Sequence, residues 1–282
     1  MRVADLARLS SADLHPCFLE AFSDYLVPAQ PDLEQLRRML LRRGWVPELS
    51  AGAWQGGRLV GFWLCATPEI AGRVEGYCIA AGVSPIARRH GALSGMAAKV
   101  SQLLAKRGIF QQRLEVMEDN QRARPAYAKL GFQPARQLDC YQIQMPIAGS
   151  RYWPVTTHAG YLPAQWPQTD WLAYPPAVPN RRDSLLRADP APRWLSVRSG
   201  DVLQGSLLLS ADGEVLELMV APGCRRQGIA SQLLHAGQSL SPGGRLTFNN
   251  VDRRDLAMIS LLLRHQAVYR LSQWEMLKPA GP

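Results

Sequence analysis

Apolar residues recur at intervals of three and four after two glycines, Gly91 and Gly228. This spacing places the apolar side chains on one face of a helix, and it predicts amphipathic helices over residues 92–104 and 229–240. Each helix follows an apolar strand that ends in Val-x-Pro, and a turn with two adjacent arginines separates the strand from the helix. The chain therefore contains one strand–turn–helix pattern twice.

The segments around the two helices also correspond to each other. Residues 53–66 and 193–210 each read as two strands joined by a turn that contains glycine. A further strand follows each helix, at 113–117 and at 245–249, and a last helix and a last strand close each copy. Such self-similarity predicts that one fold occurs twice in the chain.

The order β–α–α–β–β–β–α–β–α–β predicts an α/β (α+β) fold, in which helices flank a mixed, mostly antiparallel sheet. Amphipathic helices at 11–24 and 31–44 have no obvious counterpart in the second copy. Residues 149–192 are rich in Pro, Trp and Tyr, too aromatic for a flexible linker, and we expect a partly irregular start of the second domain there. We place the domain boundary near residue 148, which gives domains 1–148 and 149–282.

The composition is that of a folded chain, because 47% of the 282 residues are hydrophobic and 20% are charged. No apolar run approaches the roughly 20 residues that a membrane-spanning helix needs. Asp5 and Arg8 interrupt the start of the chain, where a signal peptide would be apolar. We therefore expect a cytoplasmic protein without a membrane partner.

The net charge of +9 comes from 28 arginines and only 4 lysines, and the arginines are spread along the chain. This bias is typical of a G+C-rich bacterial genome and disfavours nucleic acid as a partner, whereas a small anionic ligand fits the charge equally well. The five cysteines and five histidines are scattered, with no C-x-x-C or H-E-x-x-H pattern. We expect neither a disulfide scaffold nor a metal site.

The glycine turns before the two helices carry the first candidate chemistry. A helix that begins at such a turn presents free main-chain N–H groups, which attract an anion together with the helix dipole. Adjacent arginines add positive charge, and glycine lets a ligand approach the main chain closely. The turns at 88–93 and 225–230 thus predict a diphosphate site, although a single such turn can also be a plain helix start. Neither is a P-loop or a dinucleotide fingerprint.

The two turns resemble a known motif. Residues 220–230 match in full the Val-x-Pro-x-x-Arg-x-x-Gly-x-Ala signature with which the GNAT superfamily of N-acetyltransferases binds acetyl-CoA. Residues 83–93 resemble it too, with Leu93 where a small residue is usual. Residues 120–132 are similar to a later motif of the superfamily, Asn-x-x-Ala-x-x-x-Tyr-x-x-x-Gly-Phe. The whole chain thus resembles tandem GNAT proteins.

This resemblance implies an acetyl-CoA-dependent N-acetyltransferase that acts on a primary amine of a small molecule or a peptide and needs no metal. It implies that Asn120 helps to hold the pantetheine arm and that Tyr127 protonates the leaving thiolate of CoA. Tyr127 could instead be a packing residue, because it shares a helix face with Ala123 and Leu130. Pro125 is tolerated only in a first helical turn, which predicts a helix start near Gln121.

The residues assigned to the cosubstrate are Val83, Arg88, Arg89, His90, Gly91, Ala92, Leu93, Asn120, Val220, Arg225, Arg226, Gln227, Gly228, Ile229, Ala230 and Ser231. The thioester oxygen needs a donor, which we expect among the main-chain N–H groups of residues 79–83. The candidates for the general base are Glu75, Glu115, Glu118 and Glu217, each of which could also be a solvated or paired carboxylate.

The second copy departs from the later motif. Leu262 stands where the tyrosine would be, and a shifted register would offer Ser260 instead. We therefore expect the first copy to carry the chemistry. The alternative function is a non-catalytic protein that binds or senses acyl-CoA with the same fold. The sequence does not identify the acceptor amine or the oligomeric state.

Overall fold

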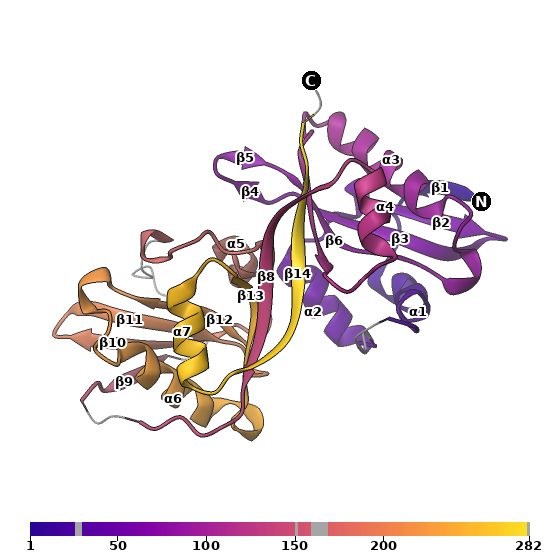
Figure 1. Cartoon of the computed structure of the whole chain (residues 1–282). Coiled ribbons are helices and arrows are strands. Elements are labelled where there is room, and N and C mark those ends of the chain that lie inside the picture. The colour runs from indigo at the N-terminus through magenta and orange to yellow at the C-terminus, as the bar shows by residue number, and fades with distance from the viewer. Residues whose placement is uncertain (26–29, 150–151, 159–168, 281–282) are drawn as a thin grey trace. The chain divides into compact units, whose positions relative to one another are not determined.

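A computed structural model of the chain describes residues 1–25, 30–149, 152–158 and 169–280. The chain packs into two compact units (Figure 1). Unit 1 consists of Met1–Ala135 and Trp274–Pro282, and unit 2 consists of Arg136–Gln273. Each unit is described by itself below.

Unit 1 is built on a sheet in which the first three neighbouring pairs are antiparallel and the fourth pair, β6–β7, is parallel. The strand order is β1 (Arg2–Asp5), β2 (Ala51–Gln55), β3 (Arg58–Ala66), β6 (Gly76–Val83), β7 (Gln112–Met117) and the end of β14 (Val268–Lys278). A small hairpin of β4 (Glu69–Ile70) and β5 (Arg73–Val74) stands apart from this sheet.

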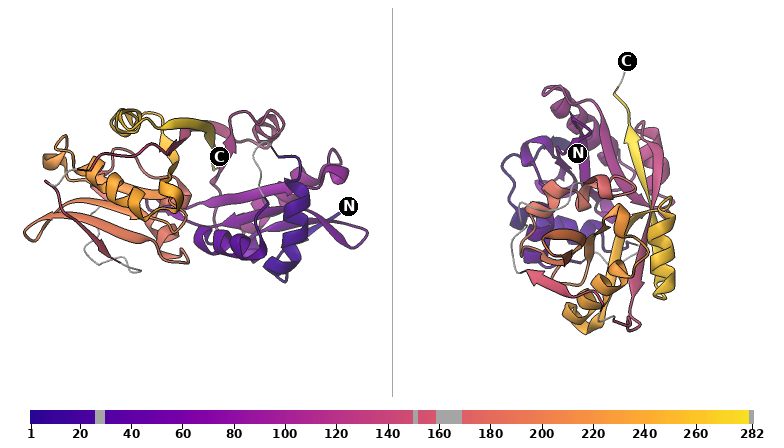
Figure 2. Two further views of the ribbon diagram at one scale, coloured as in Figure 1. Left: turned by 90° about the horizontal axis from the view of Figure 1, so that it is seen from below. Right: turned by 90° about the vertical axis from the view of Figure 1, so that its left-hand side faces the viewer.

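Helices cover both faces of this sheet (Figure 2). They are α1 (Ser11–Ala21), α2 (Leu33–Arg43), α3 (Ala92–Ala105) and α4 (Ala123–Lys129). Successive strand residues face opposite sides, so Phe62 stacks on Phe18 of α1 while Trp63 packs against α3. Ser10 and Asp32 form capping boxes that begin α1 and α2, and Gly44, in the left-handed region, ends α2.

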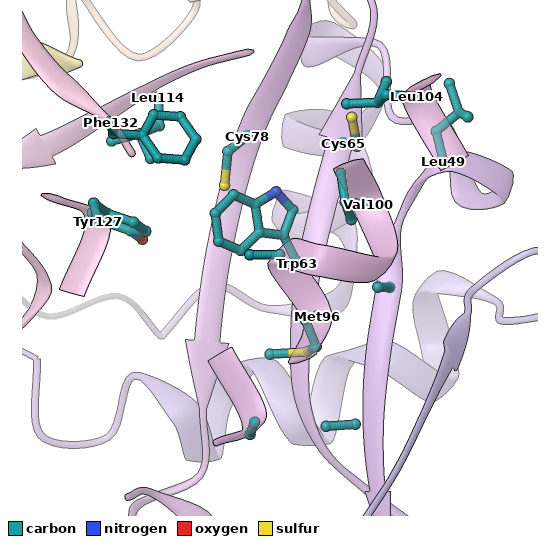
Figure 3. Packing of buried hydrophobic residues seen from close by; sticks show 14 of the residues in the cluster. Leu49, Trp63, Cys65, Cys78, Met96, Val100, Leu104, Leu114, Tyr127 and Phe132 are labelled. Carbon is teal, nitrogen blue, oxygen red and sulfur yellow. The ribbon is translucent and has the colours of Figure 1, made fainter. Parts of the chain in front are cut away.

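The core of unit 1 lies between α3, α4 and the sheet. Figure 3 shows the indole of Trp63 between Val100 of α3 on one side and Tyr127 and Phe132 on the other. Trp63 is 1% exposed, and it meets the rings of Tyr127 and Phe132 at 5.9 and 6.2 Å. This aromatic contact ties α4 to the sheet.

Unit 2 repeats the arrangement with its own elements. Its antiparallel sheet has the order β12 (Val215–Val220), β11 (Val202–Leu209), β10 (Arg193–Ser199) and β9 (Val155–His158). Its other strands are β8 (Gln133–Ile143) from Arg136 onward, β13 (Leu246–Asp252), which pairs antiparallel with β8, and the first part of β14. Its helices are α5 (Arg182–Leu186), α6 (Ile229–Leu240) and α7 (Leu256–Arg264).

Short 3-10 helices complete the two units: η1 (Pro47–Leu49), η2 (Pro85–Ala87), η3 (Thr169–Trp171), η4 (Val178–Asn180), η5 (Pro222–Cys224) and η6 (Pro242–Gly244). The order β2-β3-β6-η2-α3-β7-α4-β8 in the first copy is matched by β10-β11-β12-η5-α6-β13-α7-β14 in the second. The predicted fold class, a mixed and mostly antiparallel sheet with flanking helices in each copy, is confirmed.

The compact units do not coincide with the two sequence copies. Residues 136–148 pack with unit 2, and the end of the last strand, Trp274–Lys278, packs with unit 1. The division into domains 1–148 and 149–282 describes the sequence repeat and stays a prediction. In the part of the chain that the structure describes, no helix combines the length and the apolar character needed to cross a membrane.

A buried ion triad holds the terminal strand in unit 1. The Arg113 guanidinium donates to Glu75 at 2.9 and 3.2 Å and to Glu275 at 2.5 Å. Glu75 and Glu275 are 4% and 2% exposed, and Arg113 is the cation that these two buried carboxylates share.

We predict that Arg113→Ala lowers the free energy of unfolding by about 3–5 kcal/mol, because it leaves two buried carboxylates without their shared partner. Urea denaturation measures this change. The control is Arg38→Ala, which breaks an exposed pair with Glu34 and should change the free energy by less than about 1 kcal/mol. An equal, small effect of both substitutions would contradict the prediction.

Candidate active site

The site begins where two parallel strands separate. β6 and β7 pair through Gly76–Gln112, Tyr77–Arg113 and Cys78–Leu114, and then the pairing ends although β6 continues to Val83 and β7 to Met117. In the described part of the chain, residues 80–83 pair with β3 alone, and Ile79 lies at an irregularity in that pairing. One edge of β6 is therefore free to bond the amides of an extended ligand.

The turn after β6 presents main-chain donors at the end of this free edge. Arg89 has a φ of 66° and Gly91 a φ of 77°, both in the left-handed region, and α3 begins directly afterwards. None of the N–H groups of residues 89–94 has an acceptor among the described residues. A Cβ at Gly91 would meet no atom within 4 Å. The turn is thus an open concavity of N–H groups, a geometry that binds anions.

The turn after β12 in unit 2 has the same main-chain conformation. Arg226 has a φ of 65° and Gly228 a φ of 87°, and again no side chain caps the helix that follows. The N–H groups of residues 226–231 lack acceptors among the residues described, and a Cβ at Gly228 would meet nothing within 4 Å. The two Val-x-Pro turns are equivalent, as the sequence repeat predicts.

The first arginine of each turn braces the main chain. Arg88 donates from Nε to the carbonyl of Val83 at 3.0 Å and from both terminal nitrogens to Asp24 at 2.6 and 2.7 Å. The hydrogen bonds from Arg88 lower the pKa of Asp24 to about 2. Arg225 likewise donates to the carbonyls of Val220, at 3.4 Å, and Trp171, at 2.8 Å. The second members, Arg89 and Arg226, are exposed beside the N–H groups.

Tyr127 has the features both of a packing residue and of a proton donor. Its ring is 8% exposed and stands edge-on to Trp63 at 5.9 Å and to Phe132 at 6.0 Å (Figure 3). No described residue hydrogen-bonds its hydroxyl. Burial raises the pKa of Tyr127 well above the usual value of 10. The phenol therefore keeps its proton at neutral pH.

Asn120 caps the helix that carries Tyr127. Its Oδ1 accepts from the N–H of Ala123 at 2.9 Å, and its side chain also hydrogen-bonds Tyr25. α4 begins at Ala123, two residues after the expected start, and Pro125 lies in its first turn as expected. The contact of Asn120 with a pantetheine arm stays a prediction.

The four candidate carboxylates differ sharply in their surroundings. Glu75 is occupied by Arg113, as described above. Glu118 lies at the end of β7, and Glu217 lies in β12 of unit 2. Glu115 accepts a hydrogen bond from the hydroxyl of Tyr77, and burial raises its pKa from 4.5 to about 7.

Unit 2 places a leucine at the position of the phenol. The N–H of Phe132 donates to the carbonyl of Tyr127 at 3.1 Å, and the N–H of Ala267 donates in the same way to Leu262 at 3.0 Å. Leu262 is 0% exposed, within the core of unit 2. The structure thus supports the register with Leu262, and Ser260 is exposed on another face of α7.

Asp255 is a counterpart that the sequence analysis missed. Its side chain accepts from the N–H of Met258 at 3.0 Å and caps α7, as Asn120 caps α4. With Leu262 matched to Tyr127, Asp255 falls at the position of Asn120, seven residues earlier in each copy. In the first turn of α6, the hydroxyl of Ser231 contacts Nε2 of His265 at 2.8 Å.

Among the described residues, no three His, Cys, Asp or Glu side chains are grouped to hold a metal ion.

Comparison with known proteins identifies the relatives of this arrangement. The model of the acetyltransferase (GNAT) family matches residues 13–132 and 161–248. No curated protein sequence matches the chain significantly. Among solved structures, a tandem GNAT protein from the clavulanic acid biosynthesis pathway is similar, with 15% identity, a TM-score of 0.73, and coverage of 100% of this chain and 99% of that one. A GCN5-related N-acetyltransferase from Sphaerobacter thermophilus has 13% identity, a TM-score of 0.72, and coverage of 100% and 96%. At these identities the structural likeness concerns the fold.

We predict that Glu115→Gln changes the pH dependence of stability. The pKa of Glu115 is higher in the folded chain than in the unfolded one, so its contribution to stability is complete below about pH 4.5 and is lost as the pH rises through about 7. One pKa unit corresponds to about 1.4 kcal/mol. Between pH 4.5 and pH 8, the free energy of unfolding of the variant should therefore rise relative to that of the wild type by about 3 kcal/mol.

Urea denaturation at several pH values measures this difference. The control is Glu34→Gln, which alters a carboxylate on the exposed face of α2 and should follow the wild type at every pH. Parallel pH profiles of Glu115→Gln and the wild type would show that Glu115 titrates normally in the folded protein.

Proposed function

Because the chain belongs to the acetyltransferase (GNAT) family, we propose that it is an acetyl-CoA-dependent N-acetyltransferase acting on a primary amine of a small molecule or a peptide. The observation that carries this proposal is the combination, within unit 1, of an open turn of N–H donors and a buried phenol without a hydrogen-bond partner. The first feature suits a diphosphate, and the second suits a leaving group that needs a proton.

Different residues of unit 1 have different roles in the proposed acetyl transfer. The N–H groups of residues 89–94 hold the diphosphate of the cosubstrate, and the free edge of residues 79–83 supplies a donor for the thioester oxygen. Acetyl-CoA, when bound, supplies the acetyl group as a thioester. Tyr127 holds a proton at its hydroxyl until the thiolate leaves, and Asn120 orients the pantetheine arm.

Unit 2 has the turn but lacks the phenol. The N–H groups of residues 226–231 could hold a second diphosphate, while Leu262 has no proton to give. This substitution favours the alternative function, binding of acyl-CoA without chemistry, for unit 2 alone. We therefore propose that acetyl transfer takes place in unit 1.

We predict that Gly91→Leu weakens binding of acetyl-CoA at least tenfold, because the added side chain fills the space in front of the N–H groups. Isothermal titration measures the affinity. Gly72→Leu is the matched control: Gly72 has a φ of 75° against 77° at Gly91 and is equally uncrowded, so both variants carry the same backbone strain.

The same pair of measurements applies to unit 2, with Gly228→Leu against Gly200→Leu at a hairpin turn. Loss of binding in one unit alone identifies the unit that holds the cosubstrate. Unchanged affinity in both Gly91→Leu and Gly228→Leu would refute the assignment of the turns.

We predict that Tyr127→Phe lowers kcat by about 10²-fold, the low end for a positioned acid, and leaves the affinity for acetyl-CoA nearly unchanged. The substitution removes the hydroxyl and keeps the edge-on ring contacts with Trp63 and Phe132. Steady-state kinetics with a primary amine acceptor measure the effect, and Tyr152→Phe, at a position 78% exposed, is the control. Full activity in Tyr127→Phe, together with loss of activity in Gly228→Leu, would place the chemistry in unit 2.

A further inference from the structure

Glu115 occupies the point where β6 and β7 part. The last residue pair between these strands is Cys78–Leu114, so Glu115 is the first residue of β7 beyond the ladder. Leu114 and Val116 face the core with Trp63, whereas Glu115 faces the other side of the sheet. On that side it meets Tyr77, which is 0% exposed.

Only one oxygen of the Glu115 carboxylate is satisfied. The hydroxyl of Tyr77 donates to Oε2, while Oε1 is buried and has no hydrogen-bond partner. An unsatisfied buried acceptor is unfavourable, and more so if it is charged. The free oxygen is therefore set to accept a proton or a hydrogen bond from a group that arrives with a ligand.

The charged and titratable groups around Glu115 come from four elements. They are Arg43 of α2, Tyr77 and Cys78 of β6, Arg113 of β7 and Glu275 of β14. Arg43 donates to the carbonyl of Ile79 at 3.0 Å, and Arg113 is held by Glu75 and Glu275. Arg43 and Arg113 thus donate to other acceptors, and neither forms an ion pair with Oε1 of Glu115.

We propose that Glu115 accepts the proton of the acceptor ammonium in unit 1 and that Tyr77 is the positioning residue that holds its carboxylate. This inference rests on the proposed acetyl transfer. Cys78 interacts electrostatically both with Glu115 and with Tyr127. The proposed acid, Tyr127, and the proposed base, Glu115, therefore flank Cys78, the last paired residue of β6. In unit 2 the parallel bridge joins Glu214 to Thr247, as Tyr77 pairs with Arg113 in unit 1. Asn249 therefore stands in place of Glu115, so unit 2 lacks both groups.

The protons and electrons balance with these two residues. Glu115 takes one proton from the ammonium, which leaves a neutral amine with a free electron pair. That pair forms the bond from nitrogen to the acetyl carbon, and the carbon–sulfur bond breaks with its electrons on sulfur. Tyr127 gives its proton to the sulfur and regains one, through solvent, from the second N–H of the former amine. The proton on Glu115 leaves to solvent, which restores the carboxylate.

The burial of Glu115 supports this role, because a pKa of about 7 lets the carboxylate take a proton near neutral pH and release it again. The hydrogen bond from Tyr77 works against burial and lowers the pKa of Glu115. Removal of the Tyr77 hydroxyl should therefore raise that pKa, an effect that packing alone would not produce.

The test is the pH profile of kcat/KM for the full chain, with acetyl-CoA and a panel of primary amines: spermidine, D-glucosamine, phenylethylamine and an alanyl dipeptide. For the wild type we expect kcat/KM to fall about tenfold per pH unit below about pH 7. In Glu115→Gln this limb should vanish and the plateau should fall by about 10²-fold or more. In Tyr77→Phe the limb should move to higher pH.

Controls separate a proton acceptor from a structural residue. The affinity for acetyl-CoA, measured by titration, should be unchanged in Glu115→Gln and Tyr77→Phe, which also shows that both variants are folded. Glu34→Gln, on the exposed face of α2, should keep the wild-type profile.

The outcomes are distinguishable. Acetyl transfer by the wild type, with the acid limb and the plateau retained in Glu115→Gln, overturns this inference and leaves the proposed function standing. Absence of transfer to every amine of the panel by the wild type overturns both. A third outcome is that the acid limb of kcat/KM disappears in Glu115→Gln but does not move in Tyr77→Phe. This outcome supports Glu115 as the proton acceptor and overturns the positioning role of Tyr77.

Discussion

The parallel pairing of β6 with β7 ends after three residue pairs, and the site depends on this separation. A buried strand edge without partners is unfavourable, because each main-chain N–H and C=O must find a hydrogen bond. In unit 1 the guanidinium of Arg43 takes the carbonyl of Ile79, the first residue beyond the ladder. The guanidinium of Arg88 takes the carbonyl of Val83, and the remaining groups of residues 79–83 on this edge are available to a ligand.

The two copies share the main-chain conformation of the turns and differ in the side chains around them. In unit 2, one parallel bridge among the described residues joins Glu214, directly before β12, to Thr247 of β13, and the two strands then also separate. The turn angles agree within about ten degrees, yet Leu262 replaces Tyr127 in the second copy. Asp255 replaces Asn120, and a carboxylate at a helix start is a strong cap that also interacts favourably with the helix dipole. Unit 2 thus favours a stable framework at positions where unit 1 carries chemistry.

Local patterns were sufficient to predict the elements that position the site. Periodic apolar residues predicted helices over 92–104 and 229–240, and the structure has them at Ala92–Ala105 and Ile229–Leu240. The helix predicted at 11–24 ends at Ala21, a boundary that apolar spacing defines poorly. The equivalence of the two turns also followed from the sequence, because a glycine and its neighbours determine such a conformation locally.

Contacts between distant residues could not be read from the same patterns. The packing of Trp274–Lys278 in unit 1 depends on the pairing of strands far apart in the chain and on the ion triad of Arg113. The bracing of Arg88 by Asp24 joins residues 64 positions apart. The choice among the four glutamates required their burial and the hydroxyl of Tyr77, which no spacing in the sequence reveals.

Burial acts on Tyr127 and Glu115 in the same direction, but the two groups start from different pKa values. It raises the pKa of the phenol well above 10, so the hydroxyl is protonated throughout the neutral range. It raises the pKa of the carboxyl only to about 7, because Tyr77, Arg43 and Arg113 favour the charged form. A proton donor and a proton acceptor can therefore coexist near neutral pH within one unit.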